Sequence, residues 1–296
     1  MQATAVCKRL LDLSLRRPRT GAVHSVFDHA VNLDFGVDGL IGLIAQGKPL
    51  TPYAVSVRTD VPFAQAGVRA DMAAQLLEGK LLLPEAGIEI DLARAEPIEL
   101  SLDAIALLHT MEAKCALERL ILDALAQTDA GESLAPLVME KGENVFTRFL
   151  APRLARLTCA VSLGAWEEAA AAAANCAGCG MGLTPSSDDL LSGYLSTLHL
   201  LYRNTELADA KAHLLTIAQA AANRTNRISG TFLLHSGQAL ANAAICDLFR
   251  ATFTFLDLFA AKRAIERVLA IGSTSGADLL TGIVLALRQN IGGSTS

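Results

Sequence analysis

The stretch SLDAIALLHTMEAKCALERLILDALAQ, residues 101–127, decides the fold class of this chain. It contains neither Gly nor Pro, and its apolar residues recur at helical spacing. Ser101, followed by Asp103, predicts a capped helix start at this point. The residues before it follow a different pattern, so the hydrophobic period changes near Ser101.

Upstream of that point, short apolar runs alternate with turn residues. The runs AVHSVF, AVNLDF, LIGLIA, YAVSVR and LLLP are rich in Val, Ile and Leu and are separated by Gly, Pro, Asp and Asn, which is typical of strands joined by turns. In IEIDL, the alternation of Ile88 and Ile90 with Glu89 predicts an edge or hairpin strand of an antiparallel sheet. Residues 21–100 are therefore predicted to form a β-rich domain, antiparallel and either barrel-like or a sandwich.

Downstream, the pattern is helical almost to the end of the sequence. Because strands precede helices instead of alternating with them, the predicted class is α+β, with a larger all-helical domain over 101–290. A basic arm or short helix is expected over 1–20, and a loose tail over 291–296. Further helices are expected at about 144–162, 165–175, 187–202, 206–222, 229–249, 252–269 and 276–289.

Composition excludes several classes of function. The 296 residues are 52% hydrophobic and 19% charged, with a net charge of -5 that gives no attraction to nucleic acid. No apolar run approaches the roughly 18 residues of a membrane span, so no membrane association is expected. The six cysteines are scattered through the chain, which is typical of reduced thiols in a cytoplasmic protein.

The segment NCAGCGMGLTPSSDDLLSGY, residues 175–194, is the strongest candidate for a binding loop. Its three glycines permit positive φ, and the loop leads into a predicted helix start, which is a ready anion site. The pattern matches neither GxGxxG nor a phosphate loop with its Lys. The alternative is structural, because Ser and Asp at a helix start also cap it and complement its dipole. The candidate residues are Gly178, Gly180, Gly182, Thr184, Ser186, Ser187, Asp188 and Asp189.

Two further segments are candidates for the same site. TPSSDDLLSG at 184–193 aligns with STSGADLLTG at 273–282, an offset of 89 residues, so two similar helix starts are expected to converge. NRTNRIS at 223–229 is a polar break between apolar helices, and its two arginines suit a carboxylate or phosphate. An interhelical turn with solvated arginines is the alternative. These segments add Arg224, Thr225, Asn226, Arg227, Ser229, Ser275, Gly276 and Asp278 to the candidates.

Other chemistry-bearing residues are weaker candidates. His24, beside Ser25, is a possible ligand contributed by the β-rich domain, although a surface or core histidine is the commoner role. Cys176 and Cys179 form a single CxxC without a second pair or a His cluster at ligand spacing, so neither zinc nor an iron–sulfur cluster is indicated.

The segment GCGMGLTPSSDDLLSG, residues 178–193, resembles the AllH-type subunit family of oxamate carbamoyltransferase, whose pattern is close to GxGxGLTPSGDDxLxG. HSVFDHAVNL, RTNRIS and the helix start at Gly276 extend the resemblance over most of the chain. Ser187 stands where the family usually has Gly.

The resemblance implies a subunit of an enzyme of allantoin and purine breakdown. That enzyme interconverts carbamoyl phosphate plus oxamate with oxalurate plus phosphate, and works with two further, unlike subunits. Asp188 and Asp189 are then the catalytic candidates. Because carboxylates repel an anionic substrate, they either bind its amide N–H groups or hold a bridging Mg²⁺, the one cofactor considered.

Two other functions remain open from the sequence. The chain is either a non-catalytic interaction subunit whose glycine loop docks a partner, or a stand-alone magnesium-dependent phosphotransfer enzyme. Co-purification with two unlike proteins distinguishes a complex from the stand-alone enzyme.

Overall fold

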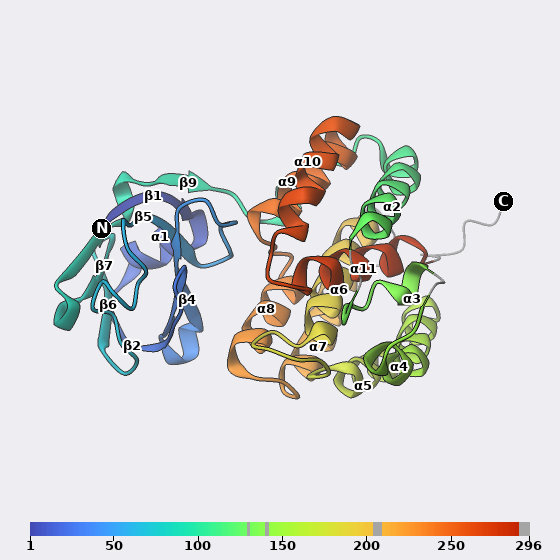
Figure 1. The fold of residues 1–296 in the computed structure, drawn as a ribbon, viewed down its shortest axis with the longest axis horizontal. Helices are drawn as coiled ribbons and strands as arrows, with labels where there is room; N and C mark the ends of the chain where they lie inside the picture. The colour runs from blue at the N-terminus through green and yellow to red at the C-terminus, as the bar shows by residue number, and fades with distance from the viewer. Residues whose placement is uncertain (129–130, 140–141, 204–208, 290–296) are drawn as a thin grey trace. The chain divides into compact units, whose positions relative to one another are not determined.

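The computed structural model describes residues 1–128, 131–139, 142–203 and 209–289, which form two compact units (Figure 1). The first unit is Met1–Leu100 and the second is Ser101–Ser296. The tail expected at 291–296 lies outside the described residues. Strands occupy the first unit and helices the second, so the predicted α+β class is confirmed.

The first unit is built on a single curled sheet of nine strands in the order β8-β7-β6-β2-β3-β4-β5-β1-β9. Most neighbouring strands are antiparallel, as predicted, but β4 with β5 and β1 with β9 are parallel. One curled sheet replaces the sandwich alternative. The strands are β1 (Gln2–Cys7), β2 (Arg19–Val26), β3 (Ala30–Asp34), β4 (Leu40–Ala45), β5 (Ala54–Arg58), β6 (Ala73–Leu77), β7 (Lys80–Leu83), β8 (Ile88–Asp91) and β9 (Glu96–Ile98).

Alternating side chains explain why these residues form half-buried strands. In β3, Val31 and Leu33 are fully buried while their neighbours are partly exposed. In β8, Ile88 and Ile90 are buried and Glu89 is exposed, and β8 lies at one edge of the sheet, as its sequence predicted.

The N-terminal segment is more than the arm or helix predicted over 1–20. The helix exists as α1 (Lys8–Arg16), but β1 precedes it and pairs with both β5 and β9. The basic residues that follow β1 obscured a strand whose Val6 and Cys7 are buried.

The second unit consists of helices. They are α2 (Thr110–Gln127), α3 (Pro136–Met139), α4 (Val145–Ser162), α5 (Trp166–Cys176), α6 (Ser186–Tyr202), α7 (Ala210–Ala222), α8 (Arg227–Gly237), α9 (Ala243–Phe249), α10 (Leu258–Leu269) and α11 (Ser275–Leu287). A π-helical turn, Arg250–Thr254, follows α9.

Three predicted helix boundaries were wrong. The first helix begins at Thr110 instead of Ser101, because Ser101 pairs with Leu240 in an isolated β-bridge. The helix expected over 229–249 breaks where the Asn242 side chain accepts a hydrogen bond at the start of α9. The helix expected from 252 begins only after Asp257, whose carboxylate caps α10 in the same way.

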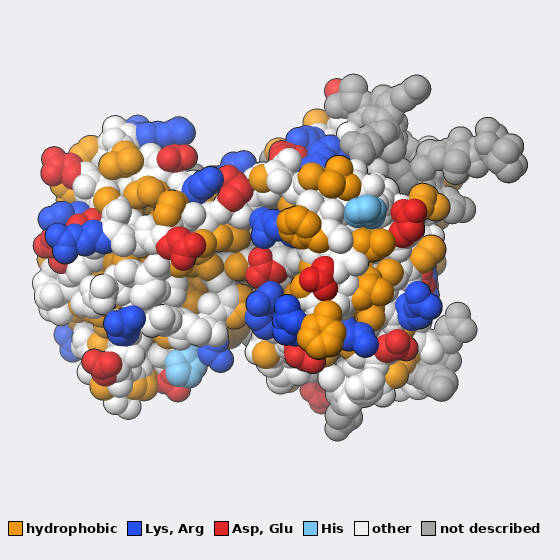
Figure 2. Space-filling view, turned by 90° about the horizontal axis from the view of Figure 1, so that it is seen from above, with side chains coloured by type: hydrophobic (Ala, Val, Ile, Leu, Met, Phe, Trp, Pro, Cys, Tyr) orange, Lys and Arg blue, Asp and Glu red, His pale blue; other side chains and the backbone are white. Residues whose placement is uncertain are grey.

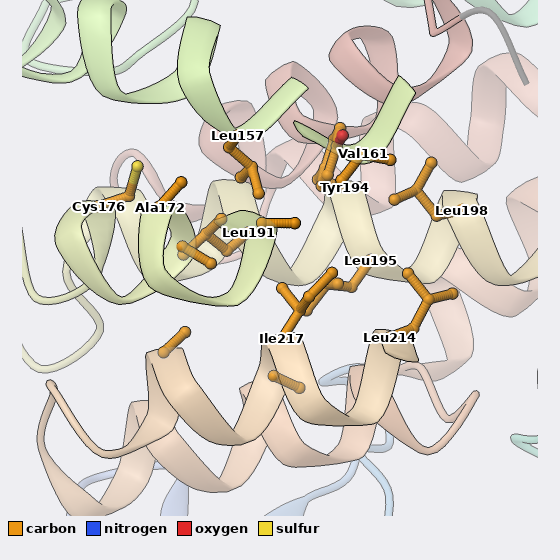
Figure 3. Packing of buried hydrophobic residues seen from close by; sticks show 14 of the residues in the cluster. Leu157, Val161, Ala172, Cys176, Leu191, Tyr194, Leu195, Leu198, Leu214 and Ile217 are labelled. Carbon is orange, nitrogen blue, oxygen red and sulfur yellow. The ribbon is translucent and has the colours of Figure 1, made fainter. Parts of the chain in front are cut away.

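The core of the second unit surrounds α6, which is buried along its whole length. Figure 3 shows α6 between α4 and α5 on one side and α7 on the other, with Leu191, Tyr194 and Leu195 packed against Leu157 and Ile217. A helix buried on all faces has a fixed position, so the loop at its N-terminus is held by the core.

The surface shown in Figure 2 carries Lys and Arg side chains interspersed with Asp and Glu on both units. No field of a single sign covers this face, in keeping with the small net charge. None of the helices in the described part of the chain is both long and apolar enough to cross a bilayer.

Candidate functional site

The glycine-rich loop is tied to the first turn of α6. The Gly178 N–H donates to Asp188 Oδ1 at 2.7 Å, and the Cys179 N–H donates to Ser187 Oγ at 2.8 Å. The Ser187 N–H donates back to the Cys179 carbonyl at 2.9 Å. Ser187, at the position where the resemblance predicts Gly, therefore sits in helical backbone, and its hydroxyl holds the loop.

All three glycines of the loop adopt positive φ, at +76° for Gly178, +136° for Gly180 and +91° for Gly182. A Cβ at Gly178 would lie 2.9 Å from the Arg224 carbonyl oxygen, and one at Gly180 would lie closer still to the backbone nitrogen of Ser186. Gly182 faces open space, so only its φ requires glycine.

The segment after α7 joins this loop through side chains. Thr225 Oγ1 donates to Asp188 Oδ2, and Asn226 Nδ2 donates to the Leu183 carbonyl at 2.9 Å. Asn226 Oδ1 also accepts from two N–H groups of the first turn of α8, which caps that helix. The structure thus brings the second candidate segment against the first, whereas Ser229 is buried inside α8.

The third candidate segment reaches the same place from α11. Thr184 Oγ1 and Ser275 Oγ lie 3.1 Å apart. Beyond them α6 and α11 cross closely, because a Cβ at Gly193 would clash with the Leu279 carbonyl and one at Gly282 would clash with the Leu190 carbonyl. Both pairs are related by the offset of 89 residues, so the two repeats pack reciprocally (Figure 1).

Three helix N-termini therefore meet beside one loop. The starts of α6, α8 and α11 each carry roughly half a positive charge. In the described part of the chain, the N–H groups of residues 180–184 donate no hydrogen bond to protein. A run of unpaired donors beside helix N-termini suits an anion. We call residues 180–184 the donor loop.

The carboxyl groups of this region are buried, and burial raises their pKa. Burial raises the pKa of Asp189 to about 8, although the hydroxyls of Ser275 and Thr184 oppose the rise. Burial likewise raises the pKa of Asp278 to about 6, against the Leu134 N–H that donates to its Oδ1 at 2.6 Å. Asp189 Oδ2 and Asp278 Oδ2 are buried without a hydrogen-bond partner.

Asp188 differs from Asp189 and Asp278 because both of its carboxylate oxygens accept hydrogen bonds. Burial raises its pKa, and the hydroxyl of Thr225 and the N–H of Gly178 oppose that rise. Its two oxygens accept from these donors, so they are not arranged as metal ligands. Among the described residues, no group of three or more His, Cys, Asp or Glu side chains could hold a metal ion. The Mg²⁺ site at Asp188 and Asp189 stays a prediction, and this arrangement does not favour it.

The remaining candidates are placed as follows. The Arg224 and Arg227 side chains are exposed, and Ser186 is buried at the start of α6. Gly276 packs against the last turn of α10, where a Cβ would clash with the Val268 carbonyl. His24 is exposed on β2 of the first unit, with Nδ1 3.2 Å from Ser25 Oγ, and its role as an anion ligand stays a prediction.

The two cysteines of the loop region are free thiols. Burial raises the pKa of Cys176 to about 12 and also raises that of Cys179. Neither is a reactive thiolate at neutral pH.

The sequence did not single out Leu134, whose N–H binds Asp278, or the arginines of α4 described below. Leu134 contributes only its backbone, so no residue type identifies it.

Because Asp189 is protonated when folded, stability is expected to depend on pH. An unfolded aspartate ionises near 3.8, whereas folded Asp189 keeps its proton to about pH 8, so the unfolded state binds fewer protons between these values. Stability from this group is full below pH 4 and is lost as pH rises to 8. At 1.36 kcal/mol per pH unit, the loss is up to about 6 kcal/mol, and Asp189→Asn removes it.

Urea unfolding at pH 4, 6 and 8 measures this effect. The free energy of unfolding of Asp189→Asn should rise relative to wild type as pH increases, while the exposed-site control Asp12→Asn should follow the wild type. Parallel pH profiles for wild type and Asp189→Asn would show that Asp189 is ionised in the folded protein.

Comparison with known families covers both units. A model of the AllH family N-terminal domain matches residues 2–97, and a model described as oxamate carbamoyltransferase subunit AllH matches residues 176–287. No curated protein and no solved structure matches the chain. The second match spans the donor loop, the segment after α7 and all of α11.

Proposed function

Because the chain belongs to the AllH family of oxamate carbamoyltransferase subunits, we propose that it binds an anionic substrate of that enzyme at the donor loop. The observation that carries the proposal is the meeting of three helix N-termini beside unpaired N–H groups. The proposed reaction joins carbamoyl phosphate and oxamate to give oxalurate and phosphate, in a complex with two unlike partner subunits.

The chemistry of carbamoyl transfer suits such donors. The amide nitrogen of oxamate forms a bond to the carbamoyl carbon and gives up a proton. The bond from that carbon to the bridging oxygen breaks, and its electron pair leaves with phosphate. Negative charge grows on the carbonyl oxygen and on the leaving phosphate, so fixed N–H groups lower the barrier; one such donor raises the rate about 100- to 1,000-fold in related acyl transfers.

Asp188 and Asp189 fit this proposal without repelling an anion. Asp189 is neutral at pH 7, and the charge of Asp188 is met by the Gly178 N–H and the Thr225 hydroxyl. In this arrangement Asp188 is a positioning residue that shapes the donor loop. Neither substrate amide groups nor Mg²⁺ are needed to shield the substrate from these two residues.

A second candidate function is favoured by two side chains of the donor loop itself. Met181 is 72% exposed and Leu183 is 56% exposed, although both are large and apolar. Such residues on a rigid loop are suited to contact another protein. A non-catalytic interaction subunit would also expose apolar side chains on such a loop. The reconstitution experiment below separates the two functions.

Reconstitution with the partner subunits tests the proposal. The tagged chain should co-purify with two unlike proteins, and only the complex should form oxalurate from carbamoyl phosphate and oxamate. Gly182→Ala, which meets open space but places a side chain at φ +91°, should distort the donor loop and lower the rate at least about tenfold.

Three outcomes contradict the proposal. Full activity of a complex carrying Gly182→Ala identifies an interaction subunit. Phosphotransfer by the isolated chain with Mg²⁺ identifies a stand-alone enzyme. An assembled complex with no carbamoyl transfer rejects the substrate assignment.

A further inference from the structure

A cleft of about 740 Å³ opens in the second unit between α4, α5 and the residues that follow α7. Three arginines line it, Arg153 and Arg156 from α4 and Arg224 after α7, together with the amides of Asn175 and Asn223. The other lining residues are alanine, proline and phenylalanine, so no acidic side chain of the described chain lines the cleft.

Arg153 and Arg156 of α4 share one face of the helix with Phe149. The Arg153 guanidinium lies over the Phe149 ring, 3.6 Å from its centroid, and its Nη1 donates to the Phe149 carbonyl at 2.7 Å. Stacking limits the freedom of this side chain and lowers the entropy lost when it binds a ligand. Within the described residues, no carboxylate forms an ion pair with Arg153, Arg156 or Arg224.

Helix ends reduce the positive charge here but do not cancel it. α5 ends at Cys176 and α7 ends at Ala222, so two C-termini, each with roughly half a negative charge, lie at the cleft. Against three guanidinium groups, this leaves roughly two positive charges. A phosphate group carries about the same charge with opposite sign and matches the planar fork of arginine.

The cleft lies next to the start of the glycine-rich loop that leads into the donor loop. Ala177 lines the cleft, and the next residue, Gly178, begins the glycine-rich loop. The Arg224 carbonyl oxygen contacts Gly178 so closely that a Cβ there would lie 2.9 Å away. Arg153 also acts across this boundary, because its charge favours the thiolate of Cys179.

We propose that this cleft binds the phosphate group of a small phosphorylated anion through Arg153, Arg156 and Arg224. The proposal rests on the proposed function, to which it adds a phosphate subsite beside the donor loop. Arg224 was already a candidate from the sequence, whereas Arg153 and Arg156 join it only through the packing of α4.

Calorimetric titration of the full chain with inorganic phosphate tests this subsite. Arg156→Gln and Arg224→Gln should each raise the Kd for phosphate about tenfold or more, because each removes a charge-assisted contact. The matched control is Arg148→Gln, on the same helix but paired with Glu143 at 2.9 Å, which should leave the Kd within about twofold. Thermal melts confirm that the variants fold.

Unchanged phosphate affinity in both cleft variants overturns the subsite, as does the absence of phosphate binding by the wild type at millimolar concentrations. Cleft variants that bind phosphate normally but lose the partner subunits identify a docking surface for acidic protein instead. The titration needs no activity, so it is separate from the reconstitution experiment. The reconstituted complex can be inactive while Arg156→Gln and Arg224→Gln still weaken phosphate binding by the isolated chain. That combination rejects the proposed reaction and leaves the phosphate subsite in place.

Discussion

Gly282→Ala is expected to destabilise the second unit by about 3 to 5 kcal/mol. A Cβ at Gly282 would fall far inside the 3.0 Å that real Cβ atoms keep from other atoms, against the Leu190 carbonyl and also near the Tyr194 nitrogen. Backbone atoms of a buried helix cannot rotate away, so α6 and α11 must separate and lose their packing. Urea unfolding measures the change.

A matched variant and a double variant sharpen this test. At Gly230 in α8, a Cβ would lie 3.1 Å from the Ala222 carbonyl, which needs a shift of only a few tenths of an ångström. Its cost should be offset by the gain of about 1 kcal/mol in helix propensity on replacing Gly with Ala. Gly193→Ala disrupts the same crossing of α6 and α11 as Gly282→Ala. The double variant should therefore lose less free energy of unfolding than the sum of the two single variants. Equal stability of Gly282→Ala and Gly230→Ala would disprove the close crossing.

The sequence predicted the fold class well because the hydrophobic period is a property of whole segments. Helix boundaries were less predictable, since single residues decide them. Asn242 and Asp257 each cap a new helix inside apolar runs that otherwise continue the helical pattern. The strand β1 was missed because pairing with β5 and β9 depends on residues far along the chain.

Part of the candidate site was also predictable. The offset of 89 residues between the two helix starts anticipated the reciprocal packing of Gly193 and Gly282, because repeated sequences tend to pack alike. The state of the carboxyl groups was not predictable. Whether Asp188 is free or bonded depends on Thr225, 37 residues away, and whether Asp189 is protonated depends on burial that only the folded core creates.

That bonding state makes Asp188→Asn the variant with the largest expected effect on activity. The carboxylate accepts from the Gly178 N–H, the Thr225 hydroxyl and the Ser187 hydroxyl, and it thereby holds both sides of the loop region. Asparagine keeps the size but turns one acceptor into a donor and removes the charge. We expect the donor loop to shift by a fraction of an ångström and carbamoyl transfer by the reconstituted complex to fall at least about a hundredfold.

Measuring stability together with activity distinguishes this loss of activity from the loss of a helix-capping interaction. Loss of a charge that only complements the α6 dipole costs about 0.3 to 1 kcal/mol and leaves activity alone. The matched control is Asp257→Asn, because Asp257 also accepts N–H groups at a helix start, from Phe259 at 3.0 Å and Ala260 at 2.9 Å, but belongs to α10 and none of the three loops. Asparagine caps as well as aspartate, so this control should keep its activity and its melting temperature. Wild-type transfer by Asp188→Asn, measured as oxalurate formed per complex, would reduce Asp188 to a capping residue and favour the interaction subunit.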